Sequence, residues 1–244
     1  MTNDLPSSPL PPPPMEPEAS PSIFRMWVDA VTKPAQSTYA AIARSPKANV
    51  TNAFVWVFLA TLVQFFISFA VNGATENRLL QQFGGQNLPT PSAGTRLIQL
   101  ICGAPIGAVV AVLFFALFVG IMHLIARVFG GRATYEQLVF TISTITVPFS
   151  LIGAVLTLLA AIPFVGICFA MISILIGIYA VVLEVIALMG VEQIGVGGAL
   201  VSTLVLPVLV CVCISCAVIA SLMVLGPVIG NTFSSINSSL QGMP

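Results

Sequence analysis

One stretch of the sequence decides the fold. Residues 138–189 read LVFTISTITVPFSLIGAVLTLLAAIPFVGICFAMISILIGIYAVVLEVIALM. The stretch holds two apolar segments, residues 138–162 and 165–189, separated only by Pro163-Phe164. A helix of about 20 apolar residues is long enough to cross a bilayer. The stretch therefore predicts two membrane helices joined by a tight hairpin turn.

The composition of the whole chain agrees with that prediction. Of its 244 residues, 57% are hydrophobic and 7% are charged, whereas a soluble domain carries about 25% charged residues. The mean hydropathy is +1.05. Eight Lys/Arg balance eight Asp/Glu, so no basic field attracts a nucleic acid. These values exclude a soluble globular protein, a disordered chain and a nucleic-acid binder, and they predict a polytopic membrane protein.

Three further apolar segments complete an all-α bundle of five predicted transmembrane helices. They lie at residues 53–71, within 97–129 and within 198–229. An odd number of spans places the two termini on opposite sides, and Lys and Arg concentrate on the cytoplasmic side. With the N-terminus inside, the inner segments hold Arg25, Lys33, Arg44, Lys47, Arg127 and Arg132, and the outer segment 72–96 holds only Arg78 and Arg96. We therefore expect a cytoplasmic N-terminus, an external C-terminus and an irregular outer lid over residues 72–96.

The N-terminal region divides into two parts. Residues 1–22 hold eight of the 18 prolines, which favours a solvated, disordered cytoplasmic tail. A second interpretation is a docking peptide for a Pro-binding module. Residues 23–47 are amphipathic, with apolar side chains at every fourth position from Ile23 to Tyr39 and a break or new start at Pro34. This segment suits the membrane interface and also suits packing on the bundle. Residues 48–230 form the predicted membrane domain, and 231–244 form a flexible C-terminal tail.

A few polar residues inside the predicted spans are the candidates for a functional site. Glu184 is the only acid deep within a span, where a charge is costly and should face protein or water. Its expected partners are hydroxyl groups of the third span, among them Thr141 and Thr144, or His123 near the inner end of the second span. Three roles are open for Glu184: a neutral or hydrogen-bonded acid that fixes helix packing, a proton or cation site, or a side chain that extends to the membrane interface. No enzyme, metal or phosphate-loop motif is found, so no catalytic residue, metal or cofactor is expected.

The loop before the third span carries a resemblance to a known family. Residues 129–137 read FGGRATYEQ, a proline follows eleven residues later, and residues 191–195 read VEQIG. This pattern resembles the Yip1 family, particularly its prokaryotic members, over residues 24–229. The motif positions in this sequence are Gly130, Gly131, Thr134, Gln137 and Pro148. The resemblance implies a compact five-helix bundle with no enzymatic chemistry and no cofactor, and in eukaryotes a role in membrane traffic and partner binding.

The same loop also predicts local structure directly. Gly130-Gly131 should end the second span, because glycine relaxes the backbone at a helix end. Thr134 should cap the next helix, with Gln137 as its capping-box partner three residues later.

Two functions remain open from the sequence. The leading hypothesis is a non-enzymatic protein of a prokaryotic cell membrane that organises the bilayer or binds other membrane proteins. The alternative is a small permease or channel that uses Glu184 in an intramembrane polar site.

Overall fold

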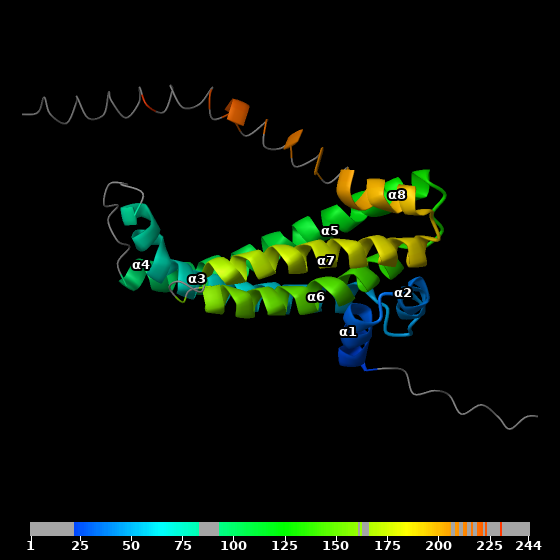
Figure 1. The fold of residues 1–244 in the computed structure, drawn as a ribbon, viewed down its shortest axis with the longest axis horizontal. Helices are drawn as coiled ribbons and strands as arrows, with labels where there is room; N and C mark the ends of the chain where they lie inside the picture. Colours follow the sequence, from blue (N-terminus) through cyan, green and yellow to red (C-terminus); the bar gives the residue numbers. More distant parts are fainter. Residues whose placement is uncertain are drawn as a thin grey trace, which may run out of the picture.

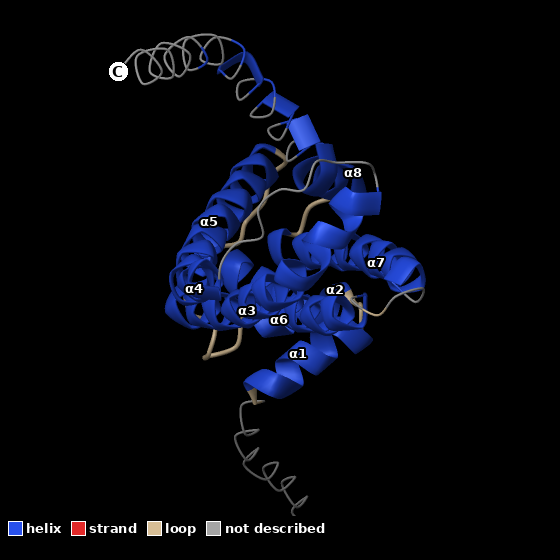
Figure 2. Cartoon of the chain, turned by 90° about the vertical axis from the view of Figure 1, so that its left-hand side faces the viewer, coloured by secondary structure: helices blue, strands red, loops and turns tan. Residues whose placement is uncertain are grey.

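The computed structural model describes residues 22–82, 93–160, 162 and 166–205, and isolated positions between 208 and 230. Within these residues every regular element is helical (Figure 2). The four long helices are α3 (Val50–Gln82), α5 (Ala104–Val128), α6 (Tyr135–Ala160) and α7 (Gly166–Glu192). They run along the longest axis of the molecule (Figure 1). Helix α6 is central, since it packs against α3, α5 and α7.

Among the described residues, four helical segments are long and apolar enough to cross a membrane. They are Val50–Val71, Leu100–Val128, Tyr135–Ala160 and Met171–Glu192, each with mean hydropathy between 2.0 and 2.7. The prediction of an all-α, multi-pass membrane protein is therefore confirmed. The start of the predicted fifth span is described as a short helix, α8 (Val196–Leu200), and a π-helical turn, η2 (Val201–Val205). Most of residues 206–229 lie outside the described residues, as do Pro163-Phe164, 1–21 and 231–244, so the fifth span stays a prediction.

The expected irregular lid over residues 72–96 is wrong where the structure describes it. Helix α3 continues to Gln82, and α4 (Ala93–Ile98) begins within the same segment. Residues 74–82 read ATENRLLQQ, which are mostly good helix formers. Extending an existing helix needs no new nucleus, so α3 continues past the apolar part of its sequence.

The second span begins with an irregular helical turn. Helix α4 leads through a π-helical turn, η1 (Gln99–Gly103), into α5, whose second residue is Pro105. Proline has no backbone N–H to donate, and wider π-helical turns accommodate such an interruption inside a helix. The chain thus passes the proline without a break in helical structure.

The amphipathic N-terminal segment forms two helices that pack on the bundle. They are α1 (Ile23–Thr32) and α2 (Gln36–Ala43), separated at Pro34. The Ser22 hydroxyl caps α1 by accepting the Arg25 N–H at 3.2 Å. Helix α1 packs against α6 and α2 packs against α7, close to one end of the bundle (Figure 1). The buried Tyr39 hydroxyl donates to the Ala30 carbonyl at 2.6 Å and ties the two short helices together.

Candidate functional site

The four polar residues singled out from the sequence lie on three helices. His123 is on α5, Thr141 and Thr144 are on α6, and Glu184 is on α7. The two threonines are buried, and each hydroxyl donates to a carbonyl of its own helix, Thr141 to Gln137 at 2.8 Å and Thr144 to Thr141 at 2.7 Å. In the described part of the chain, no hydrogen bond reaches the half-buried Glu184 carboxyl group.

His123 contacts a different acid. Its Nδ1 lies 2.6 Å from Oε1 of Glu192, the last residue of α7. The other carboxyl oxygen of Glu192 accepts the Ala133 N–H at 3.0 Å. The backbone carbonyl of Glu192 accepts the Arg132 N–H at 3.2 Å. Among the described Asp, Glu, Lys and Arg residues, only Glu192 is fully buried, with 0% of its side chain exposed.

The loop that covers Glu192 is shaped by two glycines. Gly130 has φ +88°, the left-handed conformation that glycine adopts without cost after a helix end. The Gly130 N–H donates to the Arg127 carbonyl at 3.1 Å, and the Gly131 N–H donates to the Ala126 carbonyl at 2.8 Å. A Cβ on Gly131 would lie only 2.6 Å from Oε2 of Glu192. The predicted end of the second span at these glycines is confirmed, and Gly131 lets the loop close over the carboxyl group.

The next helix starts with the predicted capping box. The Thr134 N–H donates to Oε1 of Gln137 at 3.1 Å, and the Gln137 N–H donates to Oγ1 of Thr134 at 3.3 Å. On the other side of the loop, the Arg127 guanidinium donates to the Ala133 carbonyl at 3.0 Å. The loop is therefore held by both flanking helices as well as by Glu192.

One proton lies between the Glu192 carboxyl group and the His123 imidazole in their hydrogen bond. Either the imidazole donates Nδ1–H to a carboxylate, or a neutral carboxyl group donates O–H to Nδ1. In both arrangements each carboxyl oxygen has a partner, as a buried acid requires. The Tyr135 ring lies 6.1 Å from the His123 ring, and its hydroxyl donates to the Ala116 carbonyl at 2.9 Å, which closes one side. Removing one member of such a pair is strongly destabilising.

The order of the helices along the chain is a signal for this pair. His123 lies near the C-terminal end of α5, and Glu192 ends α7. Two helices separated by one intervening antiparallel helix place their C-terminal ends at the same end of a bundle. Helix order alone therefore makes Glu192 a candidate partner of His123, whereas the partner expected for His123 was Glu184.

These features define a polytopic helical membrane protein whose helices are tied together at one end by a buried acid–histidine pair. A Yip1 domain family model matches residues 28–235. The chain belongs to the Yip1 domain family, whose members are generally non-enzymatic membrane proteins. The resemblance drawn from the loop sequence is thus confirmed. No curated protein and no solved structure gave a significant match.

The family-motif positions lie in two places. Gly130, Gly131, Thr134 and Gln137 all belong to the loop and helix start around Glu192. Pro148 lies inside α6, where it cannot donate to the carbonyl of Thr144. Among the described residues, no group of three or more His, Cys, Asp or Glu is placed to hold a metal ion.

Proposed function

We propose that the protein is a non-enzymatic component of a prokaryotic cell membrane that organises the bilayer or holds partner proteins. The observation that carries this proposal is that most buried polar side chains among the described residues are paired internally, with the Thr203 hydroxyl as the exception. Glu192 is paired with His123 and Ala133, and the hydroxyls of α6 are paired within their own helix. A polar pathway through the bundle needs side chains that face a shared space, and these groups face one another or the backbone.

We further propose that the chain crosses the membrane five times with its N-terminus in the cytoplasm. The excess of basic residues in the inner segments supports this orientation. Labelling of single cysteines at positions 22 and 238, in a cysteine-free background, tests it. Modification of both positions from the same side would remove the five-span topology.

Helix α1 supports a role at the membrane surface, because its residues separate into three faces. Met26 and Ala30 are buried against the bundle. Phe24 and Val28 form an exposed apolar face, 70% and 43% exposed. The remaining face carries Asp29, which pairs with Lys33 at 2.8 Å and with Arg25 at 3.9 Å. A helix beside membrane spans with one apolar and one charged face fits the bilayer interface, in addition to its packing on the bundle.

Copurification from intact membranes tests the partner-binding role. The full chain is compared with a variant that lacks residues 1–21 and keeps Ser22, which caps α1. A second variant, in which Pro11–Pro14 are replaced by serine, keeps the tail length. Membrane proteins enriched by the full chain support the proposal, and their loss in both variants assigns the contact to the tail. An absence of enriched proteins, together with no effect on membrane shape or lipid organisation, would contradict it.

One observation favours the alternative of a small permease or channel. The Glu184 carboxyl group accepts and donates no hydrogen bond within the described residues, although it lies in a membrane span. Glu184→Gln keeps the shape of the side chain and removes its charge. The test measures pH-gradient-driven ion flux in liposomes and thermal stability on the same variant. A parent flux that the folded variant loses would replace the proposed function with transport.

A further inference from the structure

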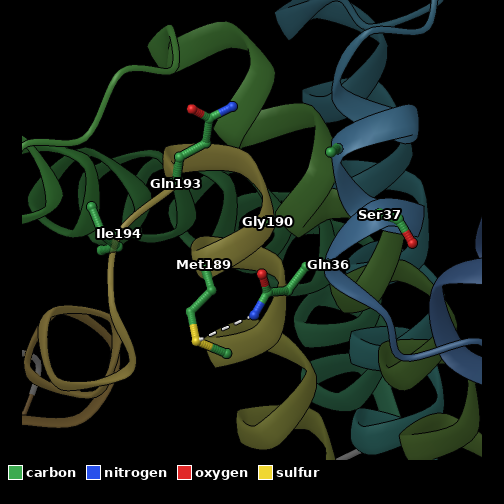
Figure 3. Close-up of a pocket in the computed structure, with 7 residues that line it drawn as sticks. Gln36, Ser37, Met189, Gly190, Gln193 and Ile194 are labelled. Carbon is green, nitrogen blue, oxygen red and sulfur yellow. Dashed lines mark hydrogen bonds between the residues drawn. The ribbon is translucent and has the colours of Figure 1, made fainter.

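A polar groove follows the contact between α2 and α7 at the end of the bundle that holds Glu192. Its larger part has a volume of about 350 Å³ and is lined by Gln36, Ser37, Ala40, Met189, Gly190, Gln193 and Ile194 (Figure 3). A smaller part of about 130 Å³ shares Ala40, Gly190 and Gln193, and adds Arg44, Arg132 and Gln137. The two parts adjoin through these shared residues.

The walls of the groove are fixed by close backbone packing. A Cβ on Gly190 would overlap the Gln36 carbonyl oxygen, so glycine allows α2 to lie directly on α7. The Gln36 amide also donates to the Met189 sulfur at 3.8 Å, and Figure 3 marks this contact with a dashed line. The loop wall is held by Glu192 through the Arg132 and Ala133 N–H groups. The groove is therefore part of the fixed architecture.

The smaller part contains two arginines without an acidic partner. Among the described residues, the Arg44 and Arg132 side chains make no ion pair or hydrogen bond. The nearby acids are already engaged, because Glu192 is paired with His123 beneath the loop, and Glu136 accepts the Val50 N–H at 3.3 Å. Arg44 and Arg132, whose side chains are exposed, thus line one pocket with no acidic residue in its lining.

Other groups at the same pocket also favour an anion. The Gln137 carbonyl oxygen accepts from Thr134, which leaves its amide N–H₂ available as a donor. Gln137 lies in the first turn of α6, a long helix whose N-terminal end carries a partial positive charge. The exposed Gln193 adds a further amide to the lining.

We propose that this pocket binds a phosphate monoester group, with Arg44 and Arg132 as its principal ligands. Arginine presents a fork of donors that matches phosphate oxygens, and two arginines match a charge of about −1.5 to −2. The volume of about 130 Å³ leaves room for one phosphate group. The larger part, with Met189, Ile194 and amide side chains, would take the organic portion of the ligand. The inference is independent of the proposed function, because such a site could serve a transporter equally.

The phosphate could belong to a lipid headgroup or to a soluble molecule, and the probes separate the two. The full chain is purified in an uncharged detergent. Binding is measured for glycerol 3-phosphate, for dioctanoyl phosphatidic acid and for dioctanoylglycerol, which has the same tails without phosphate. We expect saturable binding of a phosphate-bearing probe and no saturable binding of dioctanoylglycerol. Binding of phosphatidic acid alone assigns the site to a lipid, and equal binding of glycerol 3-phosphate assigns it to a soluble phosphate ester.

Matched arginine variants locate the site. Arg44→Gln and Arg132→Gln should each weaken binding by about tenfold or more, because each removes a charge-assisted contact. Arg25→Gln is the control, since Arg25 is exposed, lies on α1 outside the groove and is paired with Asp29. Unchanged thermal unfolding of all three variants confirms that they are folded. No saturable binding of either phosphate probe, or an equal loss in the Arg25 variant, would overturn the proposal.

Discussion

Replacement of Glu192 by leucine should destabilise the folded protein far more than the same replacement of Glu184. The two glutamates lie on the same helix, α7, but differ in their partners. Glu192 is fully buried and holds the His123 imidazole and the Ala133 N–H. Within the described residues, Glu184 holds neither a donor nor an acceptor. The substitution is chemically identical at both positions, so the difference reports the partners.

The magnitude follows from the groups that each substitution strands. Glu192→Leu leaves a buried Ala133 N–H and a nearly buried His123 nitrogen without partners, and each stranded group costs about 1–3 kcal/mol. Because the His123 side chain is 13% exposed, water can reach it in part, and its cost falls in the lower half of that range. We expect a loss of about 2–5 kcal/mol. Glu184→Leu strands no described partner, so it should either lower stability by less than about 1 kcal/mol or raise it.

Three further variants, Glu192→Gln, His123→Leu and the double variant His123→Leu with Glu192→Leu, separate the pair from its surroundings. Glu192→Gln should cost about 1 kcal/mol, because the amide oxygen can accept from Ala133 while its N–H₂ donates to a neutral imidazole. His123→Leu combined with Glu192→Leu should cost less than the sum of the two single variants, because neither side chain is then stranded by the other. The expected coupling is about 1–3 kcal/mol.

The assay is reversible unfolding by SDS in mixed micelles, followed by far-UV circular dichroism. Apparent free energies are compared for the parent and the five variants under one set of conditions. A Glu184→Leu variant that loses as much as Glu192→Leu, or a Glu192→Leu variant within about 0.5 kcal/mol of the parent, would refute the reasoning. Additive losses in the double variant would show that the short His123–Glu192 contact contributes no coupling.

Substitutions at Gly130 and Gly131, at Tyr39 and at Gln193 test the local geometry. Gly131→Ala should cost about 2–4 kcal/mol, because its Cβ would clash with Glu192. Gly130→Ala should cost only about 1–2 kcal/mol, because φ is +88° there but nothing lies within 4 Å of the added Cβ. Unfolding in SDS measures both losses, and equal losses would contradict the expected order. Burial raises the pKa of the Tyr39 phenol, so the folded state holds this proton more tightly and stability should fall as pH rises above about 10. Tyr39→Phe loses the hydrogen bond to Ala30 and should be about 1 kcal/mol less stable than the parent at pH 7. The parent alone should lose about 1.4 kcal/mol between pH 7 and pH 11, so stability profiles over this range should show the deficit vanish and the order of the two proteins reverse slightly. A constant deficit would exclude the effect. Gln193 has the left-handed φ of +57°, which glycine adopts readily and a β-branched residue does not. Gln193→Val should therefore be at least about 1 kcal/mol less stable than Gln193→Gly in the same unfolding assay. The reverse order would show that the backbone at this position is not left-handed.

The sequence predicted the membrane class, the helical fold and the approximate positions of the four apolar spans among the described residues. Apolar length is a local property, so each described span could be placed to within a few residues from its own sequence. The end of the second span and the start of the third span are likewise determined by local sequence. Gly130-Gly131 and the Thr134–Gln137 capping box act within a few residues of themselves, so their structure needed no knowledge of the rest of the chain.

The sequence was less informative where an apolar pattern stopped. Residues 72–82 lose their hydrophobicity, yet the helix continues, because helix propensity and span length are different properties. The placement of residues 23–47 was also open. Only the packed structure showed Met26, Ala30 and Tyr39 buried against the bundle, since an amphipathic face fits lipid and protein equally well.

The partners of the buried polar groups were decided by tertiary structure alone. Composition identified Glu184 as the costly acid, because it lies deep in an apolar run. The packing instead places Glu192 in the fully buried position and brings His123 to it across 69 positions in sequence. Likewise Arg44 and Arg132 come together only because α2 folds back on α7. Hydropathy and capping depend on neighbours along the chain and can be read from it, whereas a side chain's partner depends on how helices rotate and pack, which no local pattern contains.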